Sequence, residues 1–125
     1  MNSMHALLYL THKTGSNILY PTEPNEEDIM FDFEKFEVYK EAKLFTKELS
    51  DVAESLPNKY SRIIDQLIRA SLSIPLNIAE GAGRYSKPDK KNFYTISRGS
   101  VFECVAILDI LSDKGLIDIM LPTGR

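Results

Sequence analysis

Apolar residues recur in alternating steps of four and three along three stretches of the chain. This spacing is typical of amphipathic helices that pack lengthwise against one another. The first stretch follows "MFDF", with Asp32 as the predicted N-cap and Pro57 as the residue that stops the helix. Its apolar seam consists of Val38, Ala42, Phe45, Leu49, Val52 and Leu56.

The second stretch starts near Asn58 and contains a proline in its middle. Pro75 removes one helical hydrogen bond and clashes with the carbonyl of Ser71, at a cost of about 3 kcal/mol if nothing compensates. The apolar spacing nevertheless continues past it, so the sequence predicts one kinked helix rather than two helices. The seam comprises Tyr60, Ile64, Leu67, Ser71, Ile74, Ile78 and Gly81.

A second apolar side distinguishes this helix. Leu72, Leu76 and Ala79 lie away from the seam, so this half of the helix is apolar almost all round. A helix of that kind is buried on two sides. We therefore expect these three residues to contact a second subunit.

The third stretch opens at "SKPDKKNF", with Ser86 as the predicted N-cap and Pro88 in the first turn, and it ends at Gly115. Two adjacent stripes run along it. One is Phe93, Ile96, Ser100, Glu103, Ile107 and Ile110; the other is Tyr94, Ser97, Val101, Cys104, Leu108 and Leu111. Three amphipathic helices with short connections, and no convincing strand, predict an all-α fold with antiparallel up-down topology.

Length and composition fit one ordinary soluble domain. The chain has 125 residues, 43% of them hydrophobic and 26% charged. Its apolar runs are too short to span a membrane. Cys104 is the single cysteine and has no internal partner, which favours a reducing cytoplasm.

Charge is distributed unevenly along the chain, whose net charge is −3. Residues 57–100 carry 8 Lys and Arg against 3 Asp and Glu, whereas residues 1–56 carry 5 against 11. The middle of the chain is therefore a basic segment within an acidic protein.

A specific resemblance appears at "LIRASLSIPLNIAEGAGRYSKPDKKNFYTISRGSVFECVAIL". The segment resembles the four-helix bundle protein family, also called 23S rRNA-intervening sequence proteins. The matching residues are Gln66, Arg69, Ala70, Ser73, Pro75, Asn77, Ile78, Ala79, Glu80, Gly81 and Arg84, followed by Phe93, Gly99, Ser100 and Glu103. The resemblance implies an up-down-up-down bundle that is frequently a homopentamer. It also implies kinship with the basic, nucleic-acid-binding accessory proteins of diversity-generating retroelements.

Two departures from the family pattern define the expected domain boundaries. Only ten residues follow Gly115, and they reach about 15 Å as a helix against about 40 Å for the third helix, so the fourth helix is short or missing. The family pattern begins near residue 30. We predict an N-terminal extension over residues 1–29 that is flexible or peripheral, a helical bundle over 30–117, and a short tail over 118–125.

A dense polar set spans the second and third helices. Paired carboxylates can serve acid–base chemistry or metal binding. The sequence favours a structural role instead, because no nucleophile or substrate-binding set accompanies them. We predict a buried network that locks the two helices together. Its members are Arg69, Asn77, Glu80, Ser100 and Glu103.

Other kinds of chemistry lack their usual residues. A di-iron site in a helical bundle needs Glu-x-x-His pairs, but His5 and His12 are the only histidines and both precede the helices. Cys104 has neither a histidine nor a CxxC partner, so it is interpreted as a packing residue. The glycines of "EGAGR" do not follow a strand, which excludes a dinucleotide-binding turn. We expect no enzyme activity, cofactor, metal or small-molecule substrate.

The remaining candidate site is a set of basic residues near the turn between the second and third helices. They are Arg84, Lys87, Lys90, Lys91 and Arg98. They predict contact with the phosphates of RNA or DNA, while the alternative is a solvated face. The expected function is that of a cytoplasmic, non-enzymatic, oligomeric bundle acting as a nucleic-acid-binding or ribonucleoprotein accessory. The alternative function is a purely structural oligomeric scaffold that binds other proteins.

Overall fold

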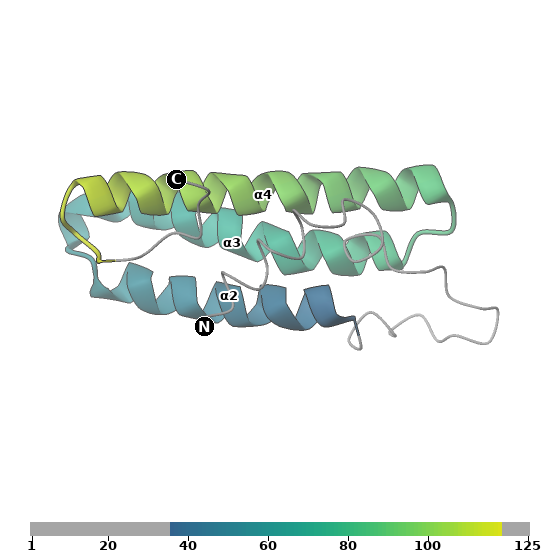
Figure 1. Cartoon of the computed structure of the whole chain (residues 1–125), viewed down its shortest axis with the longest axis horizontal. Helices are drawn as coiled ribbons and strands as arrows, with labels where there is room; N and C mark the ends of the chain where they lie inside the picture. The colour runs from purple at the N-terminus through teal and green to yellow at the C-terminus, as the bar shows by residue number, and fades with distance from the viewer. Residues whose placement is uncertain (1–35, 119–125) are drawn as a thin grey trace.

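Three α-helices and one short 3-10 helix make up residues 36–118, which are the residues that the computed structural model describes. No strand occurs among them. Consecutive helices run in opposite directions, as Figure 1 shows, so the predicted all-α, antiparallel up-down bundle is confirmed. The elements are α2 (Glu37–Ser55), η2 (Asn58–Tyr60), α3 (Ser61–Ala82) and α4 (Lys87–Asp113).

Helix α2 buries the apolar seam predicted from the sequence, except at one position near its C-terminal end. Leu56, in extended conformation, ends the helix just before Pro57. Near that end Ala53 is buried, whereas Val52 is only half-buried. The predicted N-cap, Asp32, lies outside the described residues, and the helix begins after Phe36.

Helix α3 continues through Pro75 without interruption, which confirms the prediction of one helix rather than two. The carbonyl of Ser71, four residues earlier, cannot accept a bond from Pro75 because proline has no N–H group. Thr46 on α2 supplies a donor in its place. Its Oγ1 lies 3.0 Å from the Ser71 carbonyl oxygen and 2.9 Å from that of Ala42, so one proton is shared between them.

Helix α4 has the predicted signals at both ends. The Ser86 side chain accepts a hydrogen bond from the backbone N–H of Asp89 over 3.2 Å, and Pro88 lies in the first turn. At the other end Gly115 adopts a φ of 72°. The N–H of Leu116 then donates to the carbonyl of Leu111 over 3.0 Å, which closes the last turn.

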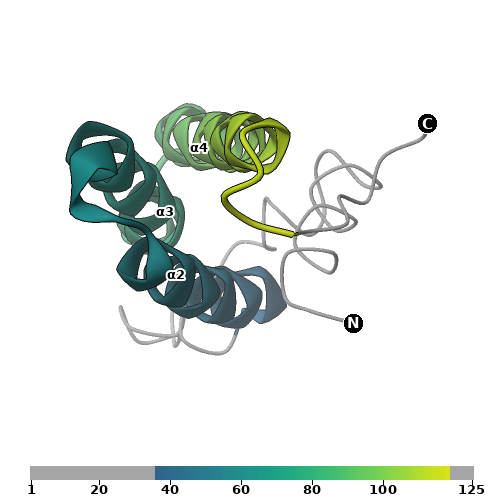
Figure 2. The same cartoon turned by 90° about the vertical axis from the view of Figure 1, so that its left-hand side faces the viewer.

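The central helix of the fold is α3, which packs against both α2 and α4. Figure 2 shows the three helices end-on at three corners of a square. No fourth helix occupies the remaining corner within residues 36–118. A single apolar core cluster nevertheless joins all three helices, and Leu116 and Ile117 pack against it from beyond α4.

The contact between α3 and α4 is very close at one point. A Cβ atom placed on Gly81 would lie 2.6 Å from a ring carbon of Tyr94, so only glycine fits there. Tyr94 is fully buried, and it belongs to the α4 stripe that is buried along its whole length. The other predicted stripe is only partly buried, because Ile96, Glu103 and Ile110 are exposed. The prediction that all of it faces the core is therefore wrong. Within the described residues α4 has one close helical neighbour, so it buries one side.

Candidate nucleic-acid interface

Lys90 does not belong to an exposed basic site. Its side chain is only 7% exposed, and Nζ donates to the carbonyl oxygen of Ala82 over 3.1 Å. That carbonyl belongs to the last turn of α3, where the helix dipole favours a positive charge. Lys90 therefore caps α3, and its predicted role as a phosphate contact is wrong for the folded chain.

Arg84 is engaged, but only at the surface. Its Nη2 atom lies 2.6 Å from Oε1 of Glu80, and the two side chains are 44% and 54% exposed. The guanidinium also lies over the ring of Phe93, 4.6 Å from its centroid. Exposed pairs at this spacing contribute only about 0.3–0.5 kcal/mol. A phosphate group can therefore compete with Glu80 for Arg84.

Lys87 and Lys91 are exposed and lie one turn apart on α4, so they share one side of the helix. Arg98 follows on the same side, two turns after Lys91, but it is half-buried. Its guanidinium lies 5.8 Å from the ring centroid of Phe102. The Nε atom of Arg98 is buried and has no hydrogen-bond partner among the described residues. Lys87 and Lys91 are thus exposed like Arg84, but unlike it they form no ion pair within residues 36–118.

Sequence reasoning missed Tyr85, which stands next to these cations. It lies in the turn between α3 and α4 and is 99% exposed. An aromatic ring can stack on any nucleic-acid base, because every base has a π-face. The signal that could have found it is an aromatic residue with no place in the apolar spacing, between Arg84 and Ser86.

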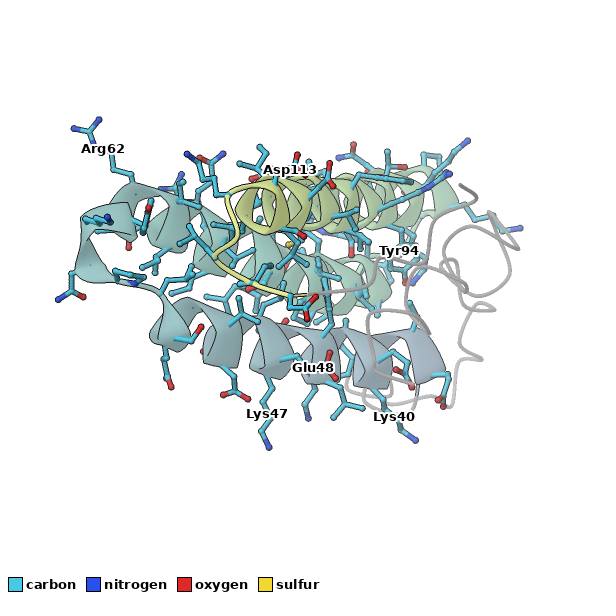
Figure 3. All side chains as sticks on the ribbon, turned by 60° about the vertical axis from the view of Figure 1, so that its left-hand side comes forward. Lys40, Lys47, Glu48, Arg62, Tyr94 and Asp113 are labelled. Carbon is cyan, nitrogen blue, oxygen red and sulfur yellow. The ribbon has the colours of Figure 1, made fainter. Side chains whose placement is uncertain are left out.

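Charge along residues 81–100 is one-sided, although Glu80 directly precedes them and the start of α2, with Glu37 and Glu41, lies at the same end of the bundle. Residues 81–100 contain five basic residues against one acidic residue, Asp89. Figure 3 labels three basic side chains outside this segment: Lys40 and Lys47 project from α2, and Arg62 projects from the start of α3. The end of the molecule formed by Arg84, Tyr85, Lys87 and Lys91 is hereafter called the basic turn.

The predicted polar network exists in a different form. Asn77 Nδ2 donates to the carbonyl oxygen of Ser73 over 2.7 Å and to its Oγ over 2.9 Å. Ser100 Oγ in turn donates to Ser73 Oγ over 2.8 Å. Ser73, which the prediction left out, is therefore the centre of the network that joins α3 to α4.

Three residues of the predicted network lie outside it. Glu80 pairs with Arg84 instead, and Arg69 and Glu103 are both exposed. The burial of Glu103 within the bundle is thus a wrong prediction. The reason is helical geometry: each step of three residues turns about 60° short of a full circle. Ser97 and Ser100 still face α3, whereas Glu103, one step further, has turned out to solvent.

Few groups in the described part of the chain suit catalysis. Burial raises the pKa of the Cys104 thiol to about 12, and the nearby charge of Glu103 adds to the effect, so the thiolate is scarce at neutral pH. Residues 36–118 contain no group of three side chains that could hold a metal ion. None of their helices combines the length and the apolar content needed to cross a membrane.

Fold and site together define a class of protein: an antiparallel bundle of amphipathic helices with a basic, aromatic turn at one end. Over residues 34–120 the chain matches the family described as 23S rRNA-intervening sequence protein, and it belongs to this family. The match spans α2, η2, α3 and α4 completely, and it confirms the family resemblance seen in the sequence. No curated protein and no solved structure matches the chain.

Proposed function

We propose that this protein is a non-enzymatic, RNA-associated accessory that binds nucleic acid with its basic turn and acts as a homo-oligomer. The observation that carries the proposal is the fully exposed Tyr85 placed between Arg84 and Lys87, with Lys91 one turn further on. The family description, which refers to 23S rRNA, agrees with it. A cytoplasmic location is part of the proposal and is supported by the lone, buried free thiol of Cys104.

The side chains of the basic turn suit unpaired nucleic acid. Lys87 and Lys91 contact phosphates, and Arg84 exchanges Glu80 for a phosphate at little cost. Tyr85 stacks on an unpaired base, an interaction that contributes about 1–3 kcal/mol per base. Binding is therefore independent of sequence and falls steeply as salt rises.

Net charge argues for self-association as a part of this function. One chain carries a charge of −3, so a single basic turn binds RNA weakly. Self-association places several basic turns on one assembly, which raises affinity through multivalency. The predicted interface residues on α3 suit this role, because Leu72 and Leu76 are 44% and 63% exposed and Ala79 is half-buried beside them.

The test is retention of a labelled hairpin RNA with an unpaired loop at about 50 and 200 mM salt. Lys87→Gln with Lys91→Gln is compared with Lys43→Gln with Lys47→Gln, an exposed pair on α2 with the same spacing. The first pair is expected to weaken binding at least tenfold and the second to leave it nearly unchanged. Tyr85→Ala is expected to weaken binding to the hairpin more than binding to a fully paired duplex.

Two outcomes would overturn the RNA proposal. One is an absence of RNA and DNA binding by the parent protein at the lower salt. The other is an equal effect of the α2 and α4 lysine pairs, which would make the basic turn an ordinary solvated surface.

A second candidate function is a protein scaffold without nucleic acid. The exposed apolar side chains Ile68, Leu72 and Leu76 on α3 favour it, since they suit a protein partner rather than a phosphate. A protein that self-associates but ignores RNA at low salt would support the scaffold.

A further inference from the structure

A half-buried row runs along α2 on the side away from α3. Thr46 marks the side of α2 that contacts α3, and the fully buried Phe45 and Leu49 form the stripe next to it. Beyond this stripe the helix turns towards the corner of the bundle that no described helix fills. The row on that side consists of Glu41, Glu48 and Val52, all half-buried.

Helix α4 has a matching row. Ser97 and Ser100 face α3, and Val101 and Leu108 form the buried stripe beside them. Because the three helices stand at three corners of a square, the far side of each stripe borders the fourth corner (Figure 2). On α4 that side carries Arg98, Val105 and Asp109, again all half-buried. The two rows together are hereafter the fourth-corner surface.

Partial burial distinguishes this surface from the outer sides of the same helices. Leu44 on α2 and Phe102 on α4 are both 51% exposed, whereas Val52 and Val105 pack against the core. Leu116 and Ile117 pack against the core as well, but two residues span far less than the 19 residues of α2. The fourth-corner surface therefore suits a longer segment with an apolar side.

The charge of the surface is mainly negative. It contains three carboxylates and one guanidinium, and Glu37 stands one turn before Glu41. Burial raises the pKa of the Glu41 carboxyl, and the charges of Glu37 and Glu48 add to the rise, so these acids act on one another. A segment that docks here is therefore expected to be basic as well as apolar.

Three stretches of the chain outside residues 36–118 differ in how well they fit. Residues 119–125 reach about 10 Å as a helix, against about 28 Å for α2. Residues 14–35 contain six acidic residues and one lysine, so an acidic surface repels them. Residues 1–13 contain Lys13, two histidines and no acidic residue, and they reach about 20 Å as a helix.

The residue spacing within this last stretch also predicts a helix with one apolar side. Leu7 and Leu8 follow Met4 by three and four residues, so a helix carries all three on one side. His5 and Tyr9 fall on the opposite side. Two residues after Lys13 comes a glycine, which is the usual signal for the end of a helix.

We propose that residues 4–13 form a helix that docks in the fourth corner of their own chain, antiparallel to α2, with Met4, Leu7 and Leu8 against the fourth-corner surface. The chain thus completes a four-helix arrangement from its N-terminal side. For these residues, which lie outside the described range, the proposal replaces the expectation of a flexible or peripheral extension. It depends neither on RNA binding nor on self-association.

The connection to α2 permits this placement. Twenty-two residues separate Lys13 from Phe36, and an extended chain of that length spans up to about 70 Å. The fourth corner lies about one helix spacing, or about 10 Å, from α2. Antiparallel packing brings Lys13 to the start of α2, where Glu37 and Glu41 stand.

The first test compares two pairs of substitutions in the full chain. Met4→Gln with Leu8→Gln alters the docking side, and His5→Gln with Tyr9→Gln alters the opposite side at the same spacing. Thermal unfolding is followed by circular dichroism. The first pair is expected to lower the unfolding midpoint by at least about 5 °C, because it removes apolar contacts with the core. The second pair is expected to leave the midpoint nearly unchanged.

The second test locates the segment on the bundle. A carbodiimide joins an amine to a carboxylate that touches it, so Lys13 is expected to be linked to Glu37 or Glu41, as mass spectrometry of the digested protein would show. The Met4→Gln and Leu8→Gln pair is expected to reduce this link at least tenfold. A mixture of isotopically labelled and unlabelled chains shows whether the link lies within one chain.

Three results would overturn the proposal. Equal midpoints for the two pairs would show that residues 4–13 do not cover the core, which leaves the corner to another protein. Links from Lys13 only to carboxylates outside α2 would place the segment elsewhere. Links between labelled and unlabelled chains would show that the segment of a second copy occupies the corner.

Discussion

Pro75 and Thr46 act together although they lie on different helices. The proline leaves the Ser71 carbonyl without its helical donor, and the threonine hydroxyl reaches that carbonyl from α2 at 3.0 Å. A buried carbonyl without a partner costs about 1–3 kcal/mol, so the hydroxyl offsets part of the cost of the proline. The bond also fixes where α2 sits along α3.

Thr46→Val is therefore expected to destabilise the protein by about 1–2 kcal/mol, since it keeps the shape of the side chain and removes the donor. The effect depends on Pro75, because an alanine at position 75 supplies its own N–H to Ser71. A double-mutant cycle with Pro75→Ala, followed by urea unfolding, measures this coupling. Equal costs of Thr46→Val in both backgrounds would contradict the interpretation.

Cys104 and Tyr94 give the protein a sensitivity to alkaline pH. The folded Cys104 thiol has its pKa raised from an ordinary 9.0 to about 12, mainly by burial, and burial alone raises the pKa of Tyr94 from 10.0 to about 12. Between pH 9 and 12 the unfolded chain loses these protons more readily than the folded chain. Stability is therefore full below pH 9 and falls as pH rises towards 12.

The expected observation is a free energy of unfolding that declines from pH 8 to pH 10 in the parent protein. Cys104→Ala, although less stable overall, is expected to decline less over the same range, because its unfolded state has no thiol to ionise. Urea titrations at four pH values provide the comparison. Identical slopes for the two proteins would show that the thiol ionises equally in both states.

Residue roles were harder to predict than residue positions. Glu103 was expected to be buried because it follows Ser100 in an apolar row, but the row faces outward in one chain. Lys90 was assigned to a phosphate site, yet it lies one turn before Tyr94 in the buried stripe. Extending that stripe by one turn towards the N-terminus would have predicted that Lys90 is buried. Its hydrogen-bond acceptor, the carbonyl of Ala82, could not be predicted from the sequence, because it depends on the path of the turn between α3 and α4.

At the scale of elements, Lys90 links the end of α3 to the start of α4. Lys90→Met retains the apolar stem and removes the Nζ donor to Ala82, so it is expected to cost about 1.5–3 kcal/mol, the range of a hydrogen bond that involves a charged group. Lys91→Met, next to it but exposed, is the matched control and is expected to change stability by under about 0.5 kcal/mol. The thermal unfolding midpoints of the two variants are compared. Equal midpoints would show that the bond from Lys90 to Ala82 does not stabilise the protein.

Helix boundaries were predictable where local chemistry sets them. Ser86 and Gly115 mark the ends of α4 through a side-chain cap and a positive φ, both of which depend on neighbouring residues only. The division of α4 into a buried and an exposed row was not predictable in the same way. It depends on how many helices surround α4, which is a property of the tertiary arrangement.

At the scale of the whole molecule, one core cluster spans α2, α3 and α4. Phe45, which is 1% exposed, is among its largest side chains and comes from α2. Phe45→Ala is expected to destabilise the protein by about 3–5 kcal/mol. Because the core is shared, all three helices are expected to unfold in one transition.

The measurement is urea unfolding followed by circular dichroism and by tyrosine fluorescence, with Leu44→Ala as the exposed control on the same helix. Coincident curves from the two probes indicate a single cooperative unit. Two separated transitions in the Phe45→Ala protein would show instead that α3 and α4 remain folded without α2.

The short turn between α3 and α4 has a consequence for the route of folding. Gly83 to Ser86 connect two long helices that touch closely at Gly81 and Tyr94, so their contacts form at small chain separation and low entropic cost. We expect this hairpin to form in the folding transition state and α2 to dock onto it afterwards. Ser97→Ala, which removes a bond to Ile74, should then mainly slow refolding, and Thr46→Val should mainly speed unfolding. Stopped-flow folding and unfolding rates of the two variants test whether the hairpin forms before α2 docks. If Thr46→Val slows refolding and Ser97→Ala speeds unfolding instead, α2 belongs to the folding nucleus.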